Sequence, residues 1–126
     1  MAVLRNKTAL AAAALAASAV LAGGLPATTA SAAPNVANIS QGSGNRQGVW
    51  CVQFATSNWA SRTGKADPIS VDGVFGPATL ALVKKFQRAS GLAADGIVGK
   101  LTGNSILDNA GAMRDWCYPR VPSTRR

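Results

Sequence analysis

The chain has 126 residues, with 13 Lys and Arg, five Asp, no Glu and no His, so its formal net charge is +8. The absence of His excludes Ser-His-Asp and Cys-His nucleophilic sites and imidazole metal ligands. Without Glu, carboxylate catalysis would depend on five scattered aspartates. The composition therefore excludes most familiar hydrolases, and we expect no catalytic residue, no metal and no cofactor. The length is that of a single domain.

Residues 1–32 have the pattern of a secretory signal peptide. Two basic residues come first, an uncharged Ala-rich and Leu-rich stretch follows at 8–25, and Ala30 and Ala32 then stand at the −3 and −1 positions. The alternative is an uncleaved anchor. It is disfavoured because the apolar stretch is shorter than the roughly 20 predominantly apolar residues that a membrane span needs. We predict cleavage after Ala32. Residues 33–126 would then be secreted and extracellular, with no membrane span and a net charge of about +6.

Residues 33–48 are rich in Asn, Ser, Gly and Gln without periodicity, which predicts a flexible leader. Apolar residues recur from Val49 onwards and predict a buried helix that begins at residue 46 or 49 and ends at 61. Gly64 and Pro68 predict a loop after it.

The clearest predicted helix begins at Gly76 and Pro77. Proline is favoured at the first helical position because its missing N–H would have no partner there. Leu80, Val83 and Phe86 follow at helical spacing and form an apolar stripe. Gly91 stops the helix.

A motif of the form D-G-x-x-G-x-x-T occurs twice, at residues 72–79 and again at 95–102. Each copy supplies an Asp-Gly turn, two apolar residues that we expect to anchor the loop, a glycine N-cap and a threonine. The second copy predicts a third helix at 100–107. Its Gly103, Asn104 and Ser105 are weak helix formers, so we expect tertiary packing to hold it.

Cys51 and Cys117 are the only cysteines. A pair in an exported protein most often forms a disulfide, which for a loop of this length contributes on the order of 4 kcal/mol. Two free thiols or an intermolecular bridge are the alternatives. We predict the intramolecular bond, which ties the tail to the first helix.

These elements predict an all-α fold: a small three-helix bundle with Asp-Gly turn loops before its second and third helices, stapled by one disulfide. The folded domain would span residues 49–118. Residues 119–126, with two prolines and a basic end, are predicted to be a disordered tail.

Several ordered segments resemble the peptidoglycan-binding domain family. They are residues 71–79, 83–88, 91–92 and 95–102, and Val52-Gln53 is similar to the Leu-Gln of that family's first helix. The resemblance covers residues 49–107. It implies a compact three-helix domain that binds bacterial cell-wall peptidoglycan, of a kind usually appended to wall enzymes.

Two positions depart from the family pattern. Gly103 stands where the family usually has Trp, and Thr56 stands where it usually has Leu. Both changes thin the apolar packing, and our hypothesis is that Trp59, Trp116 and the disulfide compensate.

Peptidoglycan presents sugar rings, hydroxyls, peptide groups and carboxylates, which call for aromatic faces, amides, carboxylates and basic side chains. The candidate ligand-binding residues are Gln53, Trp59, Arg62, Asp72, Gln87 and Arg88. Each also has a structural interpretation. The glutamines would hydrogen-bond loop backbone, Asp72 and Asp95 would form turns, Trp59 would belong to the core, and the basic residues would form a solvated face.

We predict a secreted, non-catalytic module that binds peptidoglycan, through the glycan strand or the stem peptide. Residues 33–126, which follow the predicted signal peptide, leave little room for a catalytic domain. The positive charge would also attract anionic wall polymers, and no nucleic-acid motif is present. The alternative is a partner-binding or regulatory module that contacts a cell-wall hydrolase. An enzyme would require Asp72 and Asp95 to converge in a cleft.

Overall fold

The computed structural model describes residues 35–125, so the predicted signal peptide lies outside the described residues. The α-helices are α2 (Arg46–Thr63), α3 (Pro77–Ala89), α4 (Lys100–Asp108) and α5 (Arg114–Cys117), and the short turns η3 (Gly111–Met113) and η4 (Tyr118–Arg120) flank α5. Within this part of the chain the only extended pairing is one isolated bridge. The all-α fold is confirmed, and α3 and α4 begin at the predicted residues.

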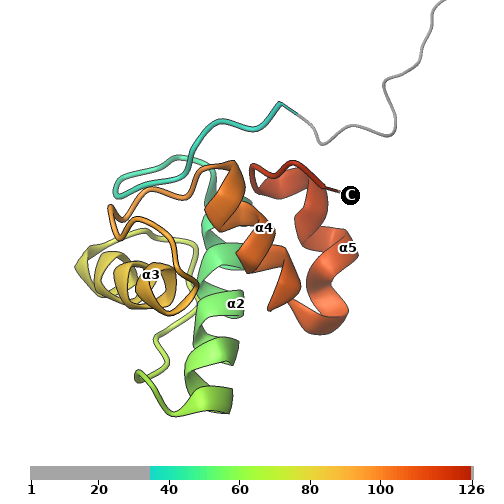
Figure 1. Ribbon diagram of the computed structural model, residues 1–126. Helices are drawn as coiled ribbons and strands as arrows, with labels where there is room; N and C mark the ends of the chain where they lie inside the picture. The colour runs from blue at the N-terminus through green and yellow to red at the C-terminus, as the bar shows by residue number, and fades with distance from the viewer. Residues whose placement is uncertain (1–34, 126) are drawn as a thin grey trace, which may run out of the picture. The chain divides into compact units, whose positions relative to one another are not determined.

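Helix α2 is the central element, and α3, α4 and α5 all pack against it (Figure 1). It begins after Asn45, whose side chain accepts a hydrogen bond from the Gly48 N–H, and it ends at Gly64 in the left-handed conformation. The core forms between α2 and its neighbours. Trp59 of α2, for example, lies edge-on against Phe86 of α3, with ring centroids 5.4 Å apart.

A disulfide joins Cys51 of α2 to Cys117 of α5, across 66 residues, and both cysteines are fully buried. The intramolecular pairing predicted from the cysteine count is therefore confirmed. The bond fixes the segment after α4 against the central helix.

The segment before α2 differs from the predicted flexible leader. Ile39 is fully buried and exchanges two backbone hydrogen bonds with Val98, of 3.0 and 2.8 Å. The Gly42 N–H donates to the Phe75 carbonyl at 3.1 Å. The prediction failed because the contacts depend on one apolar side chain and on backbone groups, neither of which produces a periodic pattern. The N-terminal segment instead contacts both motif loops.

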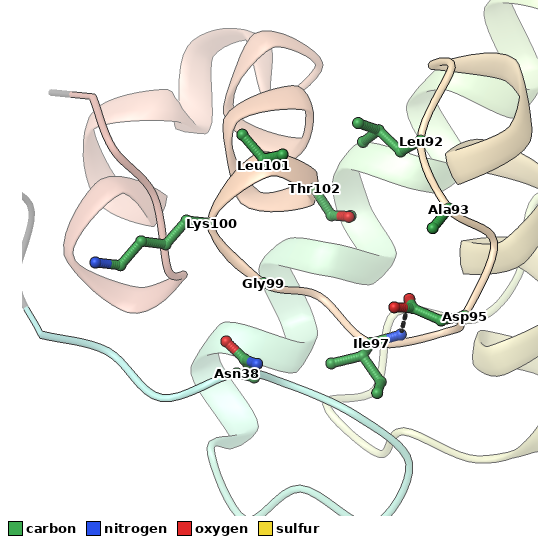
Figure 2. A pocket seen from close by; sticks show the side chains of 9 residues that line it. All are labelled: Asn38, Leu92, Ala93, Asp95, Ile97, Gly99, Lys100, Leu101 and Thr102. Atoms are coloured by element: carbon green, nitrogen blue, oxygen red, sulfur yellow. Dashed lines mark hydrogen bonds between the residues drawn. The ribbon is translucent and has the colours of Figure 1, made fainter.

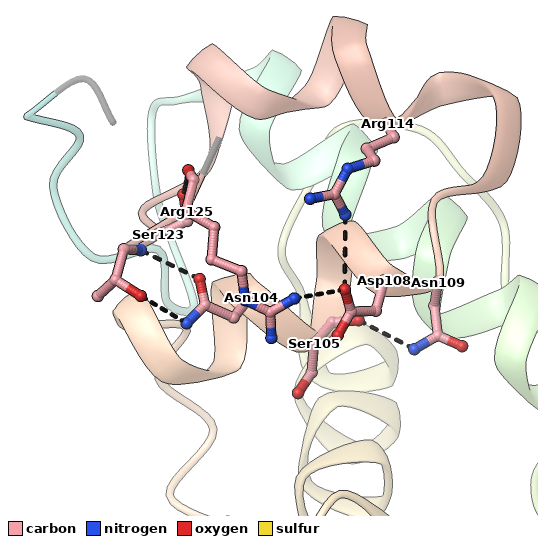
Figure 3. Close-up of polar contacts among 8 residues, drawn as sticks. Asn104, Ser105, Asp108, Asn109, Arg114, Ser123 and Arg125 are labelled. Carbon is pink, nitrogen blue, oxygen red and sulfur yellow. Dashed lines mark hydrogen bonds and ion pairs between the residues drawn. The ribbon is translucent and has the colours of Figure 1, made fainter. Parts of the chain in front are cut away.

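The C-terminal residues also differ from the predicted disordered tail. Val121 and Ser123 are buried, and Asn104 of α4 exchanges two hydrogen bonds with Thr124. Asp108 lies between Arg114 and Arg125 and pairs with both (Figure 3). The prediction of disorder failed because the residues that hold the tail lie on α4, well before the tail in the sequence.

The tail explains one departure from the family pattern. A Cβ atom at Gly103 would lie 1.6 Å from the Pro122 carbonyl oxygen, so the tail backbone occupies the space where a side chain would stand. Thr56 is also fully buried, and its hydroxyl donates to the Val52 carbonyl at 2.7 Å. The tail, which our compensation hypothesis did not include, therefore fills the position left by the missing tryptophan.

We predict that Gly103→Ala destabilises the protein. In a helix interior, alanine is more favourable than glycine by about 1 kcal/mol. Its Cβ would overlap the Pro122 carbonyl, however, and overpacking typically destabilises a protein by about 1–3 kcal/mol. Urea unfolding followed by circular dichroism measures the difference. Gly44→Ala is the control, because a Cβ there meets no atom within 4 Å. A Gly103→Ala protein as stable as the wild type would contradict this packing.

We also predict that reduction of Cys51–Cys117 lowers the free energy of unfolding by an amount on the order of 4 kcal/mol, because the bond closes a long loop. The unfolding midpoint should fall accordingly. Thermal unfolding with and without reductant tests this. The double variant Cys51→Ser/Cys117→Ser should not respond to reductant. An unchanged wild-type midpoint would rule out a stabilising role for the disulfide.

Candidate ligand-binding site

The side chain of Gln87 of α3 fixes the second motif loop through hydrogen bonds. This side chain is buried, and its Nε2 donates to Asp95 Oδ1, to the Ile97 carbonyl and to Thr102 Oγ1 at 3.0 to 3.1 Å. Its Oε1 accepts from the Gly96 N–H at 2.9 Å. One amide group therefore joins the turn, the middle of the loop and the first turn of α4.

Gln53 of α2 makes the same contacts with the first motif loop. Its Nε2 donates to Asp72 Oδ1, to the Val74 carbonyl and to Thr79 Oγ1 at 2.9 to 3.0 Å. Its Oε1 accepts from the Gly73 N–H at 2.8 Å and from the Asp72 N–H at 3.0 Å. Both glutamines thus act within the fold, as positioning residues for the loops.

The aspartates of the motif complete each turn. Asp72 Oδ1 accepts from the Val74 N–H, and Asp95 Oδ1 accepts from the Ile97 N–H, both at 2.9 Å. These backbone donors are the main reason why the pKa values of both carboxyls lie below their ordinary value of 3.8, and the glutamine amides lower them further.

The two apolar residues of each motif divide between the core and the surface. The second one is buried, Phe75 in the first loop and Val98 in the second. The first one is exposed, with exposed fractions of 54% for Val74 and 43% for Ile97. The expectation that both residues anchor the loop is therefore wrong for the first. A side chain held outward by a rigid loop is available to a ligand.

A recess of about 250 Å³ lies beside the second motif, and we call it the Leu101 recess. It is lined by Asn38, Leu92, Ala93, Asp95, Ile97, Gly99, Lys100, Leu101 and Thr102. Figure 2 shows Leu92, Ala93 and Asp95 on one side, Asn38 of the N-terminal segment across from them, and Lys100 directed away. Its wall includes Leu101, which is 64% exposed. Four large apolar side chains are exposed among residues 35–125, and two of them, Ile97 and Leu101, line this recess.

The predicted site residues do not all meet at one place. Trp59 is only 8% exposed and, with Arg88, borders a different, open recess of about 460 Å³ that also includes Lys65 and Lys85. Arg62 is exposed and donates to the Asn109 side chain near the end of α4. Asp72 is bonded to Gln53 of α2 and to the backbone of its own loop.

None of the six predicted ligand-binding residues lines the Leu101 recess. The sequence analysis did not single out Asn38, Leu92, Ile97 or Leu101 as ligand-binding residues. The repeated motif was the available signal, because it placed the loop and its flanks correctly. The side that each apolar residue faces depended on the folded loop, and Asn38 lies far from the motif in the sequence.

Among residues 35–125, no group of three or more His, Cys, Asp or Glu side chains is placed to hold a metal ion. None of the helices in that range has both the length and the apolar character needed to cross a membrane.

We predict that Asp72 and Asp95 make folding stability depend on pH in the acid range. Because folding lowers both pKa values, their contribution is fully present well above the ordinary value of 3.8 and is lost as the pH falls through the lowered values. The Asp72→Asn/Asp95→Asn variant keeps an acceptor oxygen but does not titrate. Its urea midpoint should fall less steeply than that of the wild type as the pH is lowered from about 5 to about 2. Parallel profiles would show that these turns do not couple protonation to folding.

Residues 61–106 match the model of a family described as putative peptidoglycan binding domain. The chain is 39% identical over 122 residues to a zinc D-Ala-D-Ala carboxypeptidase of Streptomyces albus G, in a match that covers 89% of this chain and 45% of that protein. It is 51% identical over 49 residues to an uncharacterized protein in the bpoA1 3' region of Kitasatospora aureofaciens, covering 37% of this chain and 42% of that protein. The chain thus spans less than half the length of either relative. No solved structure matches it.

The family match begins in the last turn of α2 and ends within α4, so it contains both motif loops, α3 and Gln87. It excludes Gln53 and Asn38, which come from the preceding segments. The resemblance that the repeated motif carries is confirmed: residues 61–106 match the peptidoglycan-binding domain family.

Proposed function

We propose that this protein is a secreted, non-catalytic module that binds bacterial peptidoglycan through the Leu101 recess. The observation that carries the proposal is the exposure of Ile97 and Leu101 above a loop that Gln87 holds rigid, within the segment that matches the family. Holding apolar groups in water-exposed positions has a cost in solvation, which a ligand that covers them would recover.

The chemistry of the recess suits a peptidoglycan unit. Such a unit combines methyl groups, from acetylated amino sugars and alanine, with amide groups close beside them. Leu92, Ile97 and Leu101 offer an apolar surface for the methyl groups. The Asn38 amide and the Asp95 carboxylate offer hydrogen-bonding groups on opposite sides of it.

A binding role fits the chain's side chains better than a catalytic one. There is no His or Glu in the sequence, and the motif aspartates Asp72 and Asp95 are used in the turns. The relative from Streptomyces albus G is named for an action on D-Ala-D-Ala, and the chain covers 45% of it. We propose that the function shared by the two proteins is attachment to the bacterial cell wall.

The proposal is tested by sedimentation with purified peptidoglycan from which anionic polymers have been removed. We expect the protein to pellet with this material at both low and moderate salt, because groove contacts are less sensitive to salt than surface charge attraction. Ala93→Trp, which places a large side chain in the Leu101 recess, should reduce retention at least about tenfold, the equivalent of about 1.4 kcal/mol. Ser61→Trp, on the exposed face of α2, is the matched control.

Three results would contradict the proposal. Pelleting only at low salt would indicate charge attraction without a specific site. Equal retention of Ala93→Trp and Ser61→Trp would place binding elsewhere on the surface. No pelleting at all would favour the alternative function, in which the module contacts a cell-wall hydrolase instead of the wall.

A further inference from the structure

We infer that the first motif loop forms a second binding site for the same ligand, so that one domain binds two peptidoglycan units. The inference rests on the proposed function. The site is a recess of about 290 Å³ beside residues 69–79, which we call the Ala78 recess. It is close in size to the Leu101 recess and, like it, lies at the start of a helix.

The two recesses have corresponding walls. Eight of the nine residues that line each one correspond in the register of the repeated motif, from Ile69 and Leu92 at one end to Thr79 and Thr102 at the other. This correspondence extends beyond the motif itself, which begins only at Asp72. Two unrelated surface recesses would not share one register through eight of their nine lining residues.

The loops beside the two recesses are also held in the same way. In each, a buried glutamine from the preceding helix bonds the motif aspartate, a loop carbonyl and the motif threonine, at 2.9 to 3.0 Å in the first loop and 3.0 to 3.1 Å in the second. In each, the first apolar residue of the motif projects outward, Val74 at 54% exposure and Ile97 at 43%. A ligand that recognises one rigid loop therefore meets the same backbone and the same kind of side chain at the other.

The differences between the recesses predict unequal affinity. Leu101 is replaced by the smaller Ala78, and no residue of the N-terminal segment lines the Ala78 recess as Asn38 lines the other. Gln53 takes the place of Asn38 in the lining of the Ala78 recess, but its amide already bonds the motif loop, so fewer polar groups remain for a ligand there. The Ala78 recess is thus the weaker of two sites for the same ligand.

Two sites on one small domain match the character of the proposed ligand. Peptidoglycan repeats the same unit many times, so a second contact with the same polymer forms at a high effective concentration. Such linkage can strengthen retention by a factor on the order of 10²–10⁴ where the geometry lets both sites engage. Weak individual recesses are then sufficient for firm attachment to a wall.

The test follows backbone amide signals of the ¹⁵N-labelled protein, with its disulfide formed, during titration with single disaccharide-peptide units released from purified peptidoglycan by a muramidase. We expect shifts in two groups, residues 69–79 and residues 92–102, with the second group saturating first. Ser70→Trp should abolish the shifts of residues 69–79 alone, and Ala93→Trp those of residues 92–102 alone. Val74→Ser and Ile97→Ser, at equivalent exposed positions, repeat the comparison without adding bulk.

Retention on intact peptidoglycan supplies the second measurement. If both sites engage one polymer, Ser70→Trp should lower retention at least about tenfold relative to Ser61→Trp. The second site would be overturned by shifts confined to residues 92–102, together with a Ser70→Trp protein that matches the wild type in its shifts and in its retention. That result would leave the proposed function intact. Absence of shifts in both groups would overturn both proposals together.

Discussion

Two buried glutamine amides fix the conformation of the two motif loops, on which the rest of the structure depends. Gln53 and Gln87 each reach from a helix into the loop that follows and bond its turn, its middle and the start of the next helix. A loop of this kind exposes backbone groups that would be costly to bury without partners. The amide supplies both a donor and an acceptor at one point, so a single side chain satisfies groups from three parts of the loop.

The rest of the bundle depends on those loops. They set where α3 and α4 begin, and both helices start at a glycine in an extended conformation without a side-chain cap. The positions of Phe75 and Val98 in the core follow, because each comes directly after the residue whose carbonyl the glutamine binds. Rigid loops also explain how apolar side chains can stay exposed without collapsing into the core.

The segments outside the family match complete the domain. The N-terminal segment pairs Ile39 with Val98 and brings Asn38 to the Leu101 recess. The C-terminal segment is tied down by Cys117 and fills the space above Gly103. The matched segment, residues 61–106, is short enough that it would bury too small a fraction of its surface to be very stable alone. The flanking contacts and the disulfide supply the stability that it lacks.

Local chemistry made much of this fold predictable from sequence. Proline after glycine, an Asp-Gly turn and a helical apolar stripe act within a few residues, so the starts of α3 and α4 and the repeated loop could be read directly. The disulfide could be predicted from the count of two cysteines together with the predicted signal peptide. The family resemblance then pointed to the class of ligand that we propose.

Long-range contacts decided the remainder. Whether Val74 and Ile97 face inward or outward depends on the loop that the glutamines shape, and both residues have the same apolar character as their buried neighbours. The burial of Ile39 depends on Val98, and the order of the tail depends on α4, so in both cases the partner is distant in the sequence and no local pattern encodes it. Composition shows which residues can be buried, but only the packed chain determines which of them are covered and which are left for a ligand.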